Sequence, residues 1–295
     1  MSANDCDGDN DLRAFARLVV DDCFAYLDGV SDPSTPPTHF KQPSELDDAL
    51  QRAAFSIEDQ GCSTQELHES VRTILRETVH TGHQRCVNQL FHRPDIVSVL
   101  GDWITATINS SIYTYESGPI VTLMEQEVVA RYQQLLGWET ISGTLPPGGS
   151  MSNLYGIACA RTNRFPHVPK EGWKSGDRPC MFVSDQGHYS SKKSCGLIGV
   201  GYDGCIAVKT DACGRMLPEA LADALEKAVA DGLHPFCVVA TAGTTLAGAV
   251  DRLDKICDVV EEFSRQQANQ SSSSGRSTDE AKSKRIWVHV DGALG

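Results

Sequence analysis

The feature of this sequence that most constrains its fold is an alternation of short, apolar, β-rich runs with amphipathic helical segments, which begins at about residue 120. The apolar runs are 181–183, 206–208, 236–239 and 286–290, and the helical segments are 121–138, about 188–198, 218–231 and 251–264. Buried strands that alternate with helices predict an α/β fold with a mostly parallel sheet and flanking helices.

The N-terminal part of the chain has a different pattern. Apolar residues recur at helical spacing between Leu12 and Tyr26, the prolines of 31–37 end that helix, and a second helix is predicted from Thr64 to Val79. We therefore divide the chain into an N-terminal helical segment, 1–95, and a large α/β domain, 96–295. Within the large domain, residues 266–285 contain four consecutive serines and almost no apolar side chains, which predicts a flexible insertion.

Composition excludes several classes of function. The formal charge of −13 argues against nucleic acids and anionic membranes as partners, because both require a basic surface. No apolar run approaches the ~18 residues of a membrane helix, and the acidic first residues resemble no leader peptide, so we expect a cytoplasmic protein. The 11 cysteines form no C-x-x-C pair and the 9 histidines show no zinc-binding spacing, so no metal site is predicted.

Polar motifs follow a glycine turn and three of the predicted strands. Gly148 and Gly149 precede Ser150 and Ser152 at the start of a helical run, an arrangement that suits a phosphate but also occurs in loops that only enter a helix. His188 and the segment Thr241–Thr245 each follow a strand, where α/β proteins present side chains to ligands, although a lone histidine is more often structural.

Asp291 ends the last predicted strand. A buried carboxylate at such a position is costly unless it meets a cation or hydrogen-bond donors. A protonated pyridine nitrogen would be such a cation. The four motifs together therefore predict a site for one phosphorylated aromatic ligand.

Six segments between Thr81 and Gly295 carry a family resemblance. They are TGHQRCVNQLF, TYESGPIVTLMEQEVV, PPGGSMSNLYGI, HYSSKKS, ATAGTTLAGAVD and WVHVDGALG. In this order they resemble group II pyridoxal-phosphate-dependent decarboxylases of the glutamate and cysteine-sulfinate decarboxylase type. The resemblance implies the aspartate-aminotransferase-like fold, pyridoxal 5'-phosphate as cofactor, an amino acid as substrate and a homodimer.

The resemblance also implies roles for particular residues. Asp291 would pair with the pyridine nitrogen, His188 would stack on the cofactor ring, and Ala293 would press against the opposite face. Ser150, the backbone of Met151 and Ser152 would hold the phosphate. Thr245 would support the polar edge of the ring. The residues expected near the substrate are Gln89, Leu90 and Phe91.

Two further expectations concern activity. Phe91 stands where glutamate-specific members carry a small polar residue, which favours cysteine sulfinate or aspartate over glutamate as the substrate. The family's Schiff-base lysine lies some tens of residues after the aspartate strand. This sequence ends four residues after Asp291, and Lys192 and Lys193 match ordinary helix positions, so we expect a chain truncated before that lysine.

The leading interpretation is thus an α-decarboxylase of an acidic amino acid. A second interpretation is a catalytically inactive fragment that binds the cofactor weakly or dimerises with a full-length relative. A plain α/β binding module is the third.

Overall fold

The computed structural model describes residues 3–52, 61–88, 90–140, 142–272 and 285–294, and the chain forms two compact units, 1–110 and 111–295. This division differs from the expected boundary between residues 95 and 96. The helix α4 (Ile96–Ile108) belongs to the first unit, because its Trp103 ring packs edge-on against Phe24 with 5.9 Å between ring centroids. The boundary therefore follows α4 instead of preceding it.

Unit 1 is helical. Besides α4 it contains α1 (Ala3–Ser31), α2 (Pro43–Arg52) and α3 (Thr64–Glu77). Local sequence determines where two of these helices begin. Ser63 and Glu66 form a reciprocal capping box at the start of α3, and the Asp95 side chain accepts a hydrogen bond from the Ser98 backbone at the start of α4.

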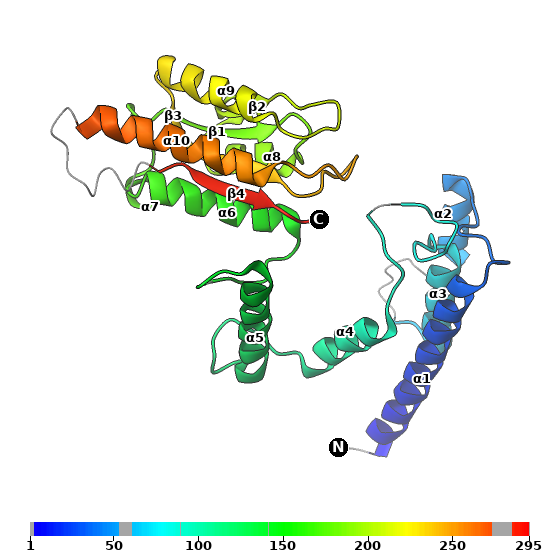
Figure 1. The fold of residues 1–295 in the computed structure, drawn as a ribbon. Coiled ribbons are helices and arrows are strands. Elements are labelled where there is room, and N and C mark those ends of the chain that lie inside the picture. The colour runs from blue at the N-terminus through cyan, green and yellow to red at the C-terminus, as the bar shows by residue number, and fades with distance from the viewer. Residues whose placement is uncertain (1–2, 53–60, 89, 141, 273–284, 295) are drawn as a thin grey trace. The chain divides into compact units, whose positions relative to one another are not determined.

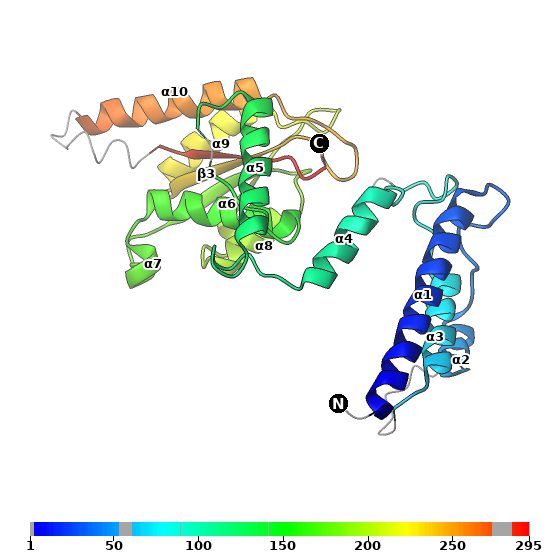
Figure 2. The ribbon, with the colours of Figure 1, turned by 90° about the horizontal axis from the view of Figure 1, so that it is seen from below.

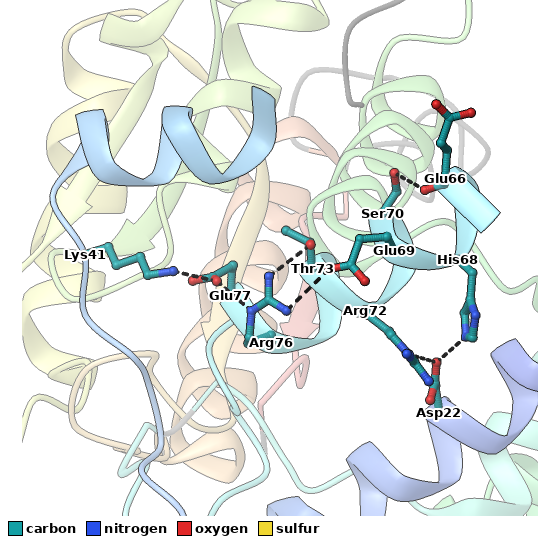
Figure 3. A network of polar contacts seen from close by, with 10 residues as sticks. All are labelled: Asp22, Lys41, Glu66, His68, Glu69, Ser70, Arg72, Thr73, Arg76 and Glu77. Atoms are coloured by element: carbon teal, nitrogen blue, oxygen red, sulfur yellow. Dashed lines mark hydrogen bonds and ion pairs between the residues drawn. The ribbon is translucent and has the colours of Figure 1, made fainter. Parts of the chain in front are cut away.

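An ion-pair network joins α1 to α3 (Figure 3). The Asp22 carboxylate of α1 accepts hydrogen bonds from His68 Nε2 at 2.6 Å and from Arg72 Nε at 3.0 Å, both on α3. The hydrogen bond from Arg72 is the largest cause that lowers the pKa of Asp22. At the other end of α3, Glu77 contacts Lys41 at 2.6 Å and Arg76 at 3.0 Å. Polar contacts therefore join α3 to α1 near one end and to the segment before α2 at the other.

In unit 2, four parallel strands form one sheet in the order β2-β1-β3-β4 (Figure 1). The strands are β1 (Pro179–Ser184), β2 (Cys205–Val208), β3 (His234–Thr241) and β4 (Trp287–Asp291). The helices of this unit are α5 (Pro119–Leu136), α6 (Gly149–Arg164), α7 (Val168–Glu171), α8 (Ser190–Leu197), α9 (Pro218–Ala230) and α10 (Leu253–Ser272), with a 3-10 turn η1 (Tyr202–Gly204). The prediction of an α/β fold with a mostly parallel sheet is confirmed.

Alternate strand residues build two cores, one on each face of the sheet. Phe182 and Val238 point to the face covered by α9 and α10, where Leu221, Leu225 and Ile256 are fully buried. The neighbouring strand residues Met181, Cys237 and Val239 point to the other face, against α6 and α8. Figures 1 and 2 show these layers from two directions. The three layers hold α6 directly against β3 and β4.

The predicted insertion 266–285 is wrong in its first part. The helix α10 continues to Ser272, because residues 266–268 are good helix formers and Gln266 hydrogen-bonds to Glu262 one turn earlier. Residues 273–284, which make up most of the predicted insertion, lie outside the described residues. None of the helices described in either unit is long and apolar enough to cross a membrane.

The Asp22 network yields a test of unit 1. Replacing Asp22 with alanine leaves the half-buried His68 without its partner, so we expect α1 and α3 to lose about 1 kcal/mol of local stability. Hydrogen exchange of the α1 and α3 amides measures this loss. The control is Asp21→Ala, the same change at the exposed preceding residue of α1, which should have little effect. Equal effects of the two substitutions would contradict the role of the network.

Candidate active site

The candidate site lies at the carboxyl edge of the sheet in unit 2. The chain leaves β1 toward β2 on one side and leaves β3 toward β4 on the other, so the loops after these two neighbouring strands diverge. Such a switch point opens a crevice, which is where α/β proteins bind ligands. His188 follows β1 and Thr245 follows β3, while Asp291 ends β4. The topology therefore brings three of the predicted motifs to one edge.

The carboxylate of Asp291 is buried and held by neutral donors. Its Oδ2 accepts a hydrogen bond from Asn153 Nδ2 at 2.8 Å, and its Oδ1 accepts one from the backbone N–H of Ala293 at 3.1 Å. Only 6% of the residue is exposed, and no salt bridge to Asp291 is found within the described part of the chain. The backbone oxygen of Asp291 accepts from Ala242 N at 2.8 Å, which ties the loop that carries Thr245 to the end of β4.

The predicted phosphate cradle is the amino end of α6. The helix begins at Gly149, after Gly148 with φ of 89°, a conformation that favours glycine. Its first-turn N–H groups, with Ser150 and Ser152, form the end of the helix that attracts anions. A Cβ atom on Gly149 would lie 2.9 Å from the Cβ of Ala293, so the helix end and the end of β4 are in direct contact (Figure 1).

His188 is linked to Asp291 through two other side chains. His188 Nδ1 lies 2.7 Å from Ser190 Oγ and also accepts from the Ser190 backbone N–H at 3.2 Å. Ser190 Oγ in turn accepts from Asn153 Nδ2 at 3.0 Å. Two residues predicted from separate motifs therefore belong to one hydrogen-bonded network.

The network includes three residues to which the sequence interpretation assigned no role, namely Asn153, Ser190 and His289. The sequence contained a signal for Asn153. It lies at helical spacing with Ile157 and Ala160, and these three residues form the buried face of α6. A polar residue at a position that periodicity places in the core is a candidate for a buried hydrogen-bonded role.

His289 completes the network from the middle of β4. Its Nε2 lies 2.8 Å from Asn153 Oδ1. Burial lowers the pKa of His289, and the nearby charge of Asp291 opposes this effect only in part. A Cβ on Gly156 would lie 2.5 Å from His289 Nδ1, so the glycine makes room for the imidazole against α6.

Leu90, Phe91 and two lysines of α8 are more exposed to solvent than the residues of the network. Leu90 and Phe91 lie in unit 1 and are each 53% exposed, while Gln89 lies outside the described residues. Lys192 and Lys193 are exposed on α8 and lie over the rings of Tyr202 and Tyr189, at 6.0 and 5.1 Å from the ring centroids. No cluster of three or more residues able to hold a metal ion occurs in the described part of the chain.

The lowered pKa of His289 predicts a pH dependence of stability. Below the ordinary histidine value of 6.5, the unfolded chain takes up a proton at this position more readily than the folded chain. The stabilisation is therefore complete above about pH 6.5 and is lost as the pH falls toward the folded-state value. We expect wild-type protein to lose more stability than His289→Gln between about pH 7 and pH 5, measured by urea unfolding. Parallel losses in the two proteins would exclude His289 as the cause.

Comparison with known proteins agrees with this geometry. Residues 43–295 match the pyridoxal-dependent decarboxylase conserved domain. The crystal structure of mouse CSAD matches with 34% sequence identity and a TM-score of 0.83, over 96% of this chain and 55% of that chain. Two more distant structures show the same fold. They are the glutamate decarboxylase domain of a Vibrio parahaemolyticus transaminase and decarboxylase (23% identity, TM-score 0.78, 96% and 57% coverage) and Oryza sativa TDC with PLP and tryptamine (21%, 0.75, 95% and 54%).

This chain spans little more than half the length of these solved relatives. The match to the conserved domain nevertheless extends over most of the chain, and it includes every element that builds the candidate site. The chain belongs to the pyridoxal-dependent decarboxylase family, whose members use pyridoxal phosphate.

Proposed function

We propose that this chain binds pyridoxal 5'-phosphate and supplies the cofactor site of an enzyme that removes the α-carboxylate of an acidic amino acid. One observation carries the proposal. The Asp291 carboxylate is buried with a neutral hydrogen-bond donor on each oxygen, and no ion pair in the described residues neutralises it. Such a carboxylate favours a cationic ligand that can donate a hydrogen bond.

The surrounding residues fit the cofactor. The amino end of α6, with Ser150, Met151 and Ser152, would hold the phosphate, since the helix dipole favours an anion there. Direct contact between Gly149 and Ala293 leaves no space for a side chain at position 149, so the start of the helix lies close to the residues that follow Asp291. An anion-binding group and a buried carboxylate are thus held side by side, as a phosphorylated pyridine requires.

When bound, the protonated ring of pyridoxal phosphate supplies an electron sink for the charge left at Cα by loss of carbon dioxide. Asp291 would keep the proton on the ring nitrogen, and its burial strengthens that interaction relative to water. The imidazole of His188 would fix the plane of the ring, and Ala293 would bound its other face. Thr245, in the loop tied to Asp291, would contact the polar edge of the ring.

For the substrate we propose cysteine sulfinate or aspartate in preference to glutamate. Phe91 supports this choice, because it stands where glutamate-specific members of the resembled family carry a small polar residue. Leu90 and Gln89 would contact the same substrate.

We also propose that the protein forms a homodimer through α4. None of the residues of α4 is buried within unit 1, although eight of its 13 residues are apolar. Val97 is 72% exposed and Ile104 is 61% exposed. A contiguous apolar surface of this kind is typical of an interface, and a second copy of the chain is the partner that the family resemblance implies.

Binding of pyridoxal 5'-phosphate tests the cofactor proposal. We expect wild-type protein to bind the cofactor in equilibrium dialysis and Asp291→Asn to bind it about 10- to 100-fold more weakly, because the substitution keeps the shape but removes the charge. The control is Asp203→Asn, the same change in the exposed turn η1. Equal affinities of the wild-type and Asp291→Asn proteins would refute the role of Asp291. In a longer protein that contains this chain together with a Schiff-base lysine, release of carbon dioxide fastest from glutamate would refute the assignment of the substrate.

Sedimentation velocity tests the dimer. We expect the double substitution Val97→Asp and Ile104→Asp to shift the protein toward monomer, because each charge would be buried without a partner at the interface. The control is Ser98→Asp, which adds a charge at an exposed polar position of the same helix. A wild-type protein that sediments as a monomer at all concentrations would contradict the proposal.

A further inference from the structure

The hydrogen-bond network around Asn153 can have only one polarity. An ionised carboxylate accepts hydrogen bonds and cannot donate them, so the group 2.8 Å from Asp291 Oδ2 must be the amide nitrogen of Asn153. The amide oxygen of Asn153 then faces His289 at 2.8 Å. The orientation of this amide follows from the chemistry of Asp291.

This orientation determines the tautomers of both histidines. Because Asn153 Oδ1 can only accept, His289 must carry a proton on Nε2 to donate to it. Ser190 Oγ already accepts from Asn153 Nδ2, so its own proton is free to point to His188 Nδ1. The backbone N–H of Ser190 points to the same nitrogen. His188 Nδ1 therefore accepts both hydrogen bonds and carries no proton, so the proton of this ring is on Nε2.

We propose that Asn153 is a positioning residue that orients the Asp291 carboxylate and sets the tautomers of His188 and His289. The consequence of this inference, a cofactor site with Asp291 in the correct orientation, rests on the proposed function. The hydrogen-bond polarity does not depend on it. Asn153 is 3% exposed. Its side chain joins α6 to β4 and to Ser190 at the start of α8, and no backbone hydrogen bond between these elements is found in the described part of the chain. Its two amide hydrogens and its oxygen each have a partner, as a fully satisfied buried amide requires.

The packing around His289 supports a directed contact. Gly156 leaves space for the ring on one side, because a Cβ atom at position 156 would lie 2.5 Å from His289 Nδ1. The ring is held with Nδ1 toward α6 at Gly156 and Nε2 toward Asn153, one turn earlier on the same helix. A side chain of the same volume without an N–H donor would fill this space but could not orient the amide.

The first experiment measures the hydrogen-bond polarity in the 1–295 chain without cofactor. Long-range ¹H–¹⁵N correlation spectra of the histidine rings should show both His188 and His289 protonated at Nε2. In Asn153→Leu the ring signals of His289 should shift, because its acceptor is gone. The control Asn163→Leu makes the same change at an exposed position of α6 and should leave both rings unchanged. A proton on Nδ1 of either ring in the wild-type protein would overturn the proposal.

The second experiment asks whether orientation or volume matters. Glutamine at position 289 can donate an N–H to Asn153 Oδ1, whereas methionine fills a similar volume and cannot. We expect His289→Gln to bind pyridoxal 5'-phosphate as the wild-type protein does. We expect Asn153→Leu to bind it about 10- to 100-fold more weakly, the effect of losing a hydrogen bond to a charged group. We expect a smaller loss, about 3- to 10-fold, for His289→Met, which removes a hydrogen bond between neutral groups.

The two experiments separate the two proposals. If wild-type protein fails to bind the cofactor, the proposed function is wrong, and the ring spectra alone decide the role of Asn153. If wild-type protein binds and both His289→Met and Asn153→Leu bind equally well, the positioning role is wrong and the proposed function stands. Circular dichroism of each variant confirms that it is folded, and the Gln–Met pair at position 289 remains informative if Asn153→Leu fails to fold.

Discussion

The burial of one carboxylate, that of Asp291, is the constraint on which the rest of the site depends. Removing a carboxylate from water is costly, and the cost falls if hydrogen-bond donors replace the lost water. Here the donors come from the amide of Asn153 and the backbone of Ala293. Because Asn153 belongs to α6, the same contact that satisfies Asp291 also determines where that helix lies against the end of β4.

The layered fold provides the rigidity that this arrangement needs. Strand residues alternate between two cores, and fully buried side chains such as Phe182 and Met181 lock the sheet between the α9–α10 layer and the α6–α8 layer. Close packing on both faces fixes the strands relative to one another, so the loops at their carboxyl ends start from fixed points. His188 and Asp291 come from strands that are not neighbours, and only the packed sheet brings them to the same edge.

The sequence predicted the sheet, because strand runs are local signals. It predicted the four strands to within two residues at either end, and it placed His188 after one strand and Asp291 at the end of another. It did not reveal how these residues are joined, since the joining residue, Asn153, acts through contacts with residues 37 and 138 positions away in the chain. The helix α4 was also missed, although its polar residues Ser98, Asp102 and Thr105 recur at helical spacing.

Two glycines of α6 help to set the distances within the candidate site. Gly149 and Gly156 are seven residues apart, about 10 Å along a helix and on the same side of it. Each lies against a residue of the last segment, Ala293 and His289, which are four residues apart. At these two points the backbone of α6 lies directly against the side chains of Ala293 and His289, and between them the side chain of Asn153 hydrogen-bonds to the strand. The distance between the amino end of α6 and the Asp291 carboxylate is therefore fixed on both sides of Asn153, and a larger residue at either glycine would change this distance.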